Sequence, residues 1–153
     1  MKQVIKYALL TATICMLISL LSLSLSAQTL LEEEVDCLAE ALYFEARSES
    51  FIAQLAVGNV IYNRVKSSKS NKTKNGKLIK NKCQFSYYCD GKKETIYNGE
   101  AYKKVVSMAH LVMEGVIIDY IKDALYYHAA YVRPYWSKNK KYLGKVGLHN
   151  FYK

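Results

Sequence analysis

The chain has 153 residues and a formal net charge of +9, from 22 lysines and arginines against 13 aspartates and glutamates. This length fits one domain and is large enough to bury a hydrophobic core. The sequence has no paired CxxC and no HExxH motif, and its three histidines are widely scattered. We therefore expect no zinc site, no other metal and no cofactor.

The N-terminus has the pattern of a secretory signal. Two lysines precede an uncharged run rich in leucine and serine at 8–25, and Ser26-Ala27-Gln28 offers small residues for cleavage. The apolar run is also just long enough to span a bilayer, so an uncleaved anchor is the alternative. We expect a signal segment at 1–27, a catalytic domain at 28–153, a secreted or periplasmic location, and membrane contact only through an uncleaved segment.

A first helix is predicted from Thr29, because Thr29-Leu30-Leu31-Glu32 has capping-box spacing. Apolar residues then recur every three or four positions, and the next step of three reaches Glu45. These apolar residues are Leu31, Val35, Leu38 and Leu42. A carboxylate on a core-facing stripe loses hydration, which raises its pKa and suits a general acid. The alternatives are a Glu45 that forms a salt bridge at the helix edge, and a helix long enough to make Glu49 the stripe-facing carboxylate.

Two more helices are predicted, followed by a looser C-terminal part. The second is expected at 52–65, where Gly58 allows a close helix crossing, and the third at 99–114, with Gly115 as its stop. The core-facing residues of the second helix are Ala53, Ala56, Val57 and Val60. The last residues, 146–153, are expected to form a short strand or an ordered tail. The predicted fold class is α+β, mainly helical.

The positive charge is concentrated in one window, 66–82, which holds seven lysines and no acid. Removal of the two signal lysines would lower the net charge from +9 to +7, so this window equals the whole remaining surplus. An exported basic protein is expected to meet an anionic cell-wall polymer or membrane surface, and its export argues against nucleic acid. The alternative is that these lysines only keep a loop in water.

Three cysteines remain after removal of the signal: Cys37, Cys83 and Cys89. In an oxidising compartment an odd number predicts one disulfide and a leftover thiol, or an intermolecular bridge. A disulfide between Cys83 and Cys89 is the first expectation, and pairing of Cys37 with either of them is the alternative.

Aromatic residues cluster at 85–88, 126–135 and 151–152. Aromatic rings offer flat faces to sugars, although most of these rings are expected to fill the core. Together with secretion, a basic surface and a stripe-facing glutamate, they point to glycan chemistry in the cell wall.

Four sequence blocks resemble the SleB-type cell wall hydrolase family, which is named for spore-cortex-lytic enzymes. The blocks are CLAEALYFEARSE…QLAVGNVIYNRV, CQFSYYCDG, YYHAAYVRPYW and VGLHNFY; they occur in the family's order and span about 37–152. The resemblance implies a small lysozyme-like domain, expected to be monomeric, that acts on peptidoglycan as a lytic transglycosylase or a muramidase.

The resemblance also implies roles for individual residues. The family's catalytic glutamate, the first of its E-A-R-G-E motif, corresponds to Glu45, and the second glutamate of the motif corresponds to Glu49. The motif glycine is replaced here by Ser48. We expect Arg64 to brace an acidic neighbour. The candidates for holding sugar or orienting the catalytic carboxyl are Gln84, Ser86, Tyr127 and His128. For His128 a hydrogen-bonded structural role is the alternative.

The number of carboxyl groups separates two mechanisms. Hydrolysis of a glycosidic bond ordinarily uses two, whereas a transglycosylase can use one. Outside the first helix the chain has few acids, and none lies in a matching motif as an obvious second catalyst. We therefore expect Glu45 alone to cleave between N-acetylmuramic acid and N-acetylglucosamine and to leave a 1,6-anhydro end. The alternatives are a hydrolytic muramidase with Glu49 as the second carboxylate, and a non-catalytic module that grips the wall through 66–82.

Overall fold

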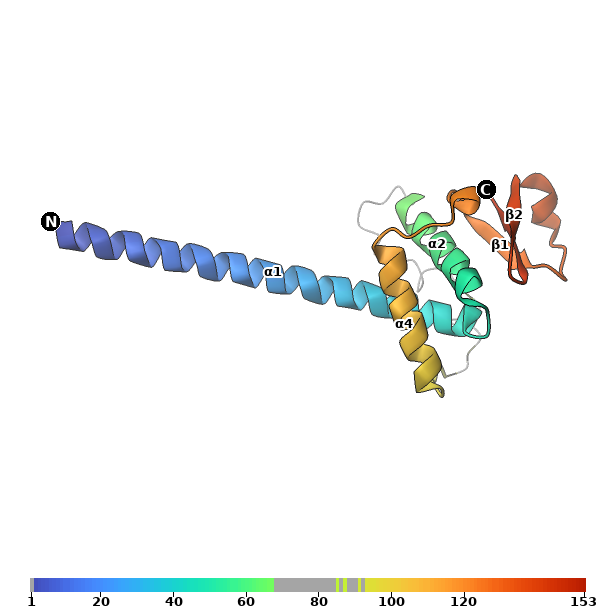
Figure 1. Cartoon of the computed structure of the whole chain (residues 1–153), viewed down its shortest axis with the longest axis horizontal. Helices are drawn as coiled ribbons and strands as arrows, with labels where there is room; N and C mark the ends of the chain where they lie inside the picture. Colours follow the sequence, from blue (N-terminus) through green and yellow to red (C-terminus); the bar gives the residue numbers. More distant parts are fainter. Residues whose placement is uncertain (1, 68–84, 86, 88–90, 92) are drawn as a thin grey trace. The chain divides into compact units, whose positions relative to one another are not determined.

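The computed structural model describes residues 2–67, 85, 87, 91 and 93–153. The chain divides into two compact units, Met1–Glu33 and Glu34–Lys153, which are described separately. Its elements, in chain order, are α1 (Lys2–Ala46), α2 (Phe51–Ser67), α4 (Gly99–Met113), η2 (Asp119–Ile121), β1 (Tyr126–Ala129), η3 (Tyr135–Asn139), β2 (Tyr142–Val146) and β3 (His149–Tyr152) (Figure 1). The predicted α+β, mainly helical fold class is therefore confirmed.

In the N-terminal unit, α1 begins at Lys2 and continues through Thr29, so the predicted helix start at Thr29 is wrong. The Thr29 hydroxyl donates to the carbonyl of Ser26 at 2.9 Å, one turn back, as the hydroxyls of serines 19, 22, 24 and 26 do along the same helix. The run before Thr29 has no proline or glycine to break the helix, and its propensity overrides the capping signal. By length and composition this helix could cross a membrane, a property that signal sequences share.

In the unit Glu34–Lys153, the last turns of α1 supply one wall of the core. Val35, Leu38 and Leu42 are buried as predicted, whereas Leu31 is 48% exposed and belongs to neither the stripe nor this unit. The helix ends at Ala46, and the Glu49 backbone N–H donates to the Ala46 carbonyl at 2.9 Å. The alternative of a longer helix with Glu49 on its stripe is therefore wrong, because Glu49 lies in the turn.

Helix α2 is the centre of this unit. Every residue from Ala53 to Ile61 is buried, so this helix has no solvent face over these positions. The expected close crossing occurs at Gly58, where a Cβ atom would lie 2.7 Å from Cγ2 of Val112 on α4. A side chain at position 58 would thus push α4 away from α2.

Helix α4 has both predicted ends. The Asn98 side chain caps its start by accepting from the Ala101 N–H at 3.0 Å, and Gly115 follows its end with a φ of +91°. The buried Asn59 of α2 then fixes the chain beyond the helix. Its Nδ2 donates to the Val116 carbonyl at 2.8 Å, and its Oδ1 accepts from the Ile118 N–H at 3.1 Å.

The three strands form an antiparallel sheet in the order β1-β3-β2, and α2 contacts both β1 and β2. The predicted C-terminal strand is confirmed as β3. Directly opposed residues share a face of the sheet, and successive residues alternate between faces. The inner face, which packs on the core, carries Tyr127, Ala129, Val146, His149 and Phe151. The outer face carries Tyr126, His128, Tyr142, Lys145, Asn150 and Tyr152.

Candidate active site

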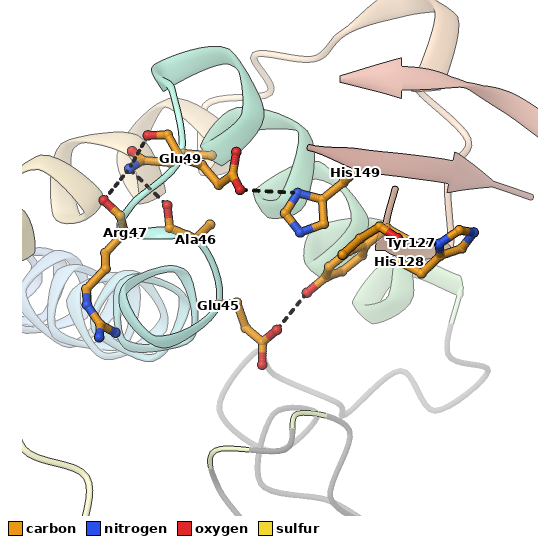
Figure 2. A network of polar contacts seen from close by, with 9 residues as sticks. Glu45, Ala46, Arg47, Glu49, Tyr127, His128 and His149 are labelled. Carbon is orange, nitrogen blue, oxygen red and sulfur yellow. Dashed lines mark hydrogen bonds and ion pairs between the residues drawn. The ribbon is translucent and has the colours of Figure 1, made fainter. Parts of the chain in front are cut away.

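The C-terminal turn of α1 presents Glu45 to the inner face of the sheet. Glu45 is partly buried, and the Tyr127 hydroxyl donates to its Oε2 at 3.1 Å (Figure 2). These two residues are 82 positions apart in the chain. The fold therefore joins two of the predicted site residues, one from a helix end and one from β1.

The surroundings of Glu45 favour its protonated form. Burial raises the pKa of this carboxyl and is the dominant effect, while the hydrogen bond from Tyr127 and the positive charge of Arg64 oppose it without cancelling it. Burial, together with the nearby carboxylate, also raises the pKa of the Tyr127 hydroxyl, so this hydroxyl remains a donor. The pKa of this carboxyl is therefore shifted in the direction that suits a general acid.

Arg64 braces the segment that leads into β1. Its Nε donates to the Leu125 carbonyl at 2.7 Å, and its guanidinium lies 6.0 Å from the centre of the Tyr127 ring. The neighbouring Asn63 donates from Nδ2 to the carbonyls of Lys122 and Ala124, at 2.7 and 3.0 Å. The Asn63-Arg64 pair thus connects the end of α2 to the chain just before Tyr127.

Gln54 fixes the turn that follows Glu45. Its side chain is buried, and its Nε2 lies within 3.2–3.4 Å of three carbonyls, those of Ala46, Arg47 and Glu49. Carbonyls at a helix end have no hydrogen-bond partner within the helix. The Gln54 amide supplies a donor to these carbonyls, which would otherwise need water. The position of Glu45 is in this way tied to α2.

A second carboxylate lies close by but is engaged elsewhere. Oε1 of Glu49 is 3.8 Å from Nδ1 of His149, and both side chains are largely buried (Figure 2). The His149 ring meets the Tyr127 ring edge-on, with centroids 5.4 Å apart. Burial lowers the pKa of His149 and outweighs the opposing effect of Glu49. Glu49 thus faces His149 without a hydrogen bond to its Nδ1, and the His149 ring packs against that of Tyr127.

His128 lies on the outer face, directly after Tyr127 in β1. Its Nδ1 and Nε2 are 2.9 Å from the Ala129 carbonyl and the Tyr152 hydroxyl, and its ring stacks on that of Tyr152. Both ring nitrogens are thus occupied within the protein. The geometry favours the structural alternative for His128 over contact with sugar.

Several predicted residues lie outside the described part of the chain: Gln84, Ser86, Cys83, Cys89 and the lysine window beyond 67. Two described members of the CQFSYYC block are buried near the site. Phe85 lies 5.7 Å below the Arg64 guanidinium, and Tyr87 stacks on Phe44 of α1 at 4.7 Å. Cys37 is partly buried against the core.

The sequence reasoning missed two groups. The sequence shows His149 only as one of three scattered histidines, and Gln54 only as the first residue of the QLAVGNVIYNRV segment that resembles the family. The alternation of His149 with the apolar Phe151 could have placed His149 on the inner face. Nothing local indicated that Gln54 would cap α1.

Among the described residues, no cluster of three or more histidine, cysteine or acidic side chains could hold a metal ion. A pocket of about 300 Å³ lies at the end of α2, lined by residues such as Asn63, Lys66 and Asp123, and it does not include Glu45. We take as the candidate site the Glu45–Tyr127 pair together with the residues that hold it in place, Gln54, Arg64 and His149.

Comparison with known proteins gives a consistent assignment. Residues 48–152 match the family described as Cell Wall Hydrolase, a match that begins three positions after Glu45. The catalytic domain of the Bacillus cereus SleB protein is similar, with 29% identity over 78% of this chain and 89% of that one and a TM-score of 0.60. So is the catalytic domain of the germination-specific lytic transglycosylase SleB from Bacillus anthracis, with 29% identity over 78% and 93% of the two chains and a TM-score of 0.61. No curated protein sequence matches the chain.

Proposed function

This chain belongs to the cell wall hydrolase family, and from that premise we propose that it is a lytic transglycosylase of peptidoglycan. It cuts the glycan strand between N-acetylmuramic acid and N-acetylglucosamine, and Glu45 is its only acid and base. The observation that carries this proposal is the partly buried Glu45 carboxyl, whose pKa is raised by burial and which accepts a hydrogen bond from Tyr127. The similarity to a domain described as a lytic transglycosylase supports the same reaction.

The reaction needs one carboxyl group acting twice. Protonated Glu45 donates its proton to the glycosidic oxygen as the bond to C1 of the muramic acid breaks, and the departing sugar leaves as an alcohol. The resulting carboxylate then takes the proton from the C6 hydroxyl of the same muramic acid, and that oxygen bonds to C1. Glu45 ends protonated again, and the product carries a 1,6-anhydro ring.

Tyr127 and Arg64 stabilise the intermediate state of this cycle. Both favour the ionised form of Glu45, Tyr127 by its hydrogen bond and Arg64 by its charge. They therefore help most after the first proton has been given away, when the carboxylate must persist until the C6 hydroxyl attacks. Burial shifts the resting carboxyl toward its protonated form, and these two groups lower the energetic cost of ionising it.

The surroundings of Glu49 support the one-carboxylate route over hydrolysis. A hydrolytic muramidase would need a second carboxyl that can reach the sugar or a water on it. The Glu49 carboxylate instead faces His149, and a Cβ atom at Gly147 would come within 3.1 Å of its other oxygen. This packing leaves Glu49 in a supporting position.

The remaining site and processing assignments are parts of the same proposal. Gln84 and Ser86 hold the sugar or orient Glu45, and His128 acts structurally. Residues 1–27 export the chain and are then removed or anchor it, so that residues 28–153 act outside the cytoplasm as a monomer. Cys83 and Cys89 pair with each other.

Mass spectrometry of the fragments released from purified peptidoglycan by the full chain, kept in solution with mild detergent, tests the proposal. We expect anhydro-muramic ends, which are lighter than reducing ends by one water. Reducing ends would replace the proposal with hydrolysis and direct attention to Glu49. If folded protein released no fragments, the non-catalytic wall-binding alternative would take its place.

A further inference from the structure

The C-terminal segment that contains the sheet is strongly basic. From residue 124 to the C-terminus the chain has five lysines, one arginine and no acid. Only Lys153 of these forms an ion pair with a described carboxylate, that of Asp123 at 2.9 Å. Five cations in this segment are therefore not neutralised by any carboxylate that the structure describes.

Aromatic rings lie among these cations. The Trp136 ring packs on the outer face against Tyr126 and Tyr152, with centroids 5.8 and 5.5 Å away. Tyr142 borders the same cluster at 5.4 Å from Tyr152 and is 54% exposed. These rings form an aromatic floor on the outer face. Its central rings pack against one another, whereas Tyr142 at its edge faces solvent.

Lysine side chains extend over this floor. Nζ of Lys140 lies 3.9 Å from the centre of the Tyr126 ring, and Nζ of Lys138 lies 5.8 Å from that of Tyr135, which is itself 79% exposed. Lys145 is exposed and lies on the outer face by its register with Asn150. We call the set Tyr135, Trp136, Lys138, Lys140, Tyr142 and Lys145 the basic aromatic face.

We propose that the basic aromatic face binds peptidoglycan at a second place, separate from the bond being cut. The exposed rings of Tyr135 and Tyr142 fit the C–H faces of sugars, with the partly buried Trp136 beneath them, and the lysines complement the carboxylates of the stem peptides. A polymer of sugars that carries carboxylates, such as peptidoglycan, is complementary to aromatic rings and lysines together. The inference rests on the proposed function only for the identity of the substrate.

The face cannot be part of the Glu45 site. Tyr127 points to Glu45 from the inner face, whereas its neighbours Tyr126 and His128 belong to the outer cluster. A glycan strand bound on the outer face is therefore not the glycan strand being cleaved at Glu45, or it is a distant part of that same strand. Binding there raises the local concentration of cleavable bonds without adding contacts to the reacting sugar.

The test measures binding without cleavage. The full chain carrying Glu45→Gln is sedimented, in mild detergent, with insoluble peptidoglycan stripped of phosphate polymers. Replacing Lys138, Lys140 and Lys145 by Gln should weaken binding about tenfold at low ionic strength and less at high salt. The matched control replaces Lys93, Lys103 and Lys104, which are exposed and of which Lys103 pairs with Glu100. It should change binding less than about twofold although the net charge falls equally.

A second pair of variants tests the rings. Tyr135→Ala should weaken binding about threefold, whereas Tyr97→Ala, at a residue 88% exposed elsewhere, should leave it unchanged. Thermal unfolding midpoints verify that every variant is folded. Equal losses in both lysine triples, no loss in either, no binding of stripped peptidoglycan, or equal dependence on the face for anionic lipid vesicles would each overturn the inference.

Fragment release by the chain with Glu45 intact separates this inference from the proposed function. If release is absent while binding still depends on the basic aromatic face, the proposed reaction fails and this inference stands. If release proceeds while binding is insensitive to the face, this inference fails alone.

Discussion

The two faces of one small sheet differ in what they do with polar groups. On the inner face, Tyr127 and His149 are directed at two carboxylates, those of Glu45 and Glu49, in partly buried surroundings. On the outer face, His128 bonds to Tyr152 within an aromatic cluster, and the cations around it have open solvent. Residues adjacent in β1 thus serve different purposes because a strand alternates its side chains.

The two faces show that burial decides how tyrosine, histidine and charged side chains affect the chemistry of the protein. Burial shifts the protonation equilibria of the inner groups, raising the pKa of Glu45 and lowering that of His149. The exposed charges of the outer face attract an anionic partner through their combined charge, and salt weakens this attraction. The comparison therefore predicts that inner substitutions change the chemistry and outer ones change stability or wall binding.

Glu45→Gln gives the largest expected effect on the rate of cleavage. Because a sole acid and base is lost, fragment release should fall at least about 10³-fold, while the unfolding midpoint stays near that of the parent chain. The matched control is Asp36→Asn, an exposed carboxylate on the same helix, which should retain activity. Full activity of a folded Glu45→Gln chain would refute the assignment and make Glu49 the suspect.

Tyr127→Phe should lower the rate about tenfold and also move the pH profile. The hydrogen bond from Tyr127 favours the carboxylate form of Glu45, so its loss raises the pKa of Glu45 further. Activity that needs protonated Glu45 is present below this pKa and is lost as the pH rises through it. The alkaline limb should therefore shift to higher pH. An unmoved limb in the Phe variant would show that Glu45 does not set it.

Glu49→Gln should reduce the rate by less than about tenfold, since the one-carboxylate proposal gives Glu49 a place beside His149 and no part in the chemistry. The Glu49 carboxylate is what raises the pKa of His149 against burial, so this pKa should fall further in the variant. Titration of the His149 ring signals by NMR measures that shift. A loss comparable to that of Glu45→Gln would instead indicate the two-carboxylate hydrolytic route.

His128→Asn should have the smallest effect on the rate and a clear effect on folding. Breaking its bond to the Tyr152 hydroxyl should lower the free energy of unfolding by about 1–3 kcal/mol. Urea unfolding gives this value, and release of fragments from short soluble glycans gives the rate. A large rate loss without loss of stability would restore the sugar-binding role predicted from the family resemblance.

Much of the helical fold could be predicted because its signals are local. The apolar spacing of α1 identified Val35, Leu38 and Leu42 as core residues, and Gly115 marked the end of α4. The start of α1 was predicted wrongly at Thr29, since a capping pattern cannot show whether the preceding residues are already helical. The prediction that Leu31 is buried was also wrong, because apolar periodicity along a helix does not reveal where the packed part of that helix begins.

By itself, the sequence determined that Glu45 is a core-edge carboxyl at a helix end in a chain that resembles cell wall hydrolases. Spacing along one helix is enough for that, because side chains three and four positions apart share a face. Only the tertiary structure decided that Tyr127 serves Glu45, that His149 engages Glu49, and that Gln54 closes the turn between them. The first two contacts join distant parts of the chain and depend on strand register, and the third depends on how α2 packs against the end of α1; no local pattern encodes either.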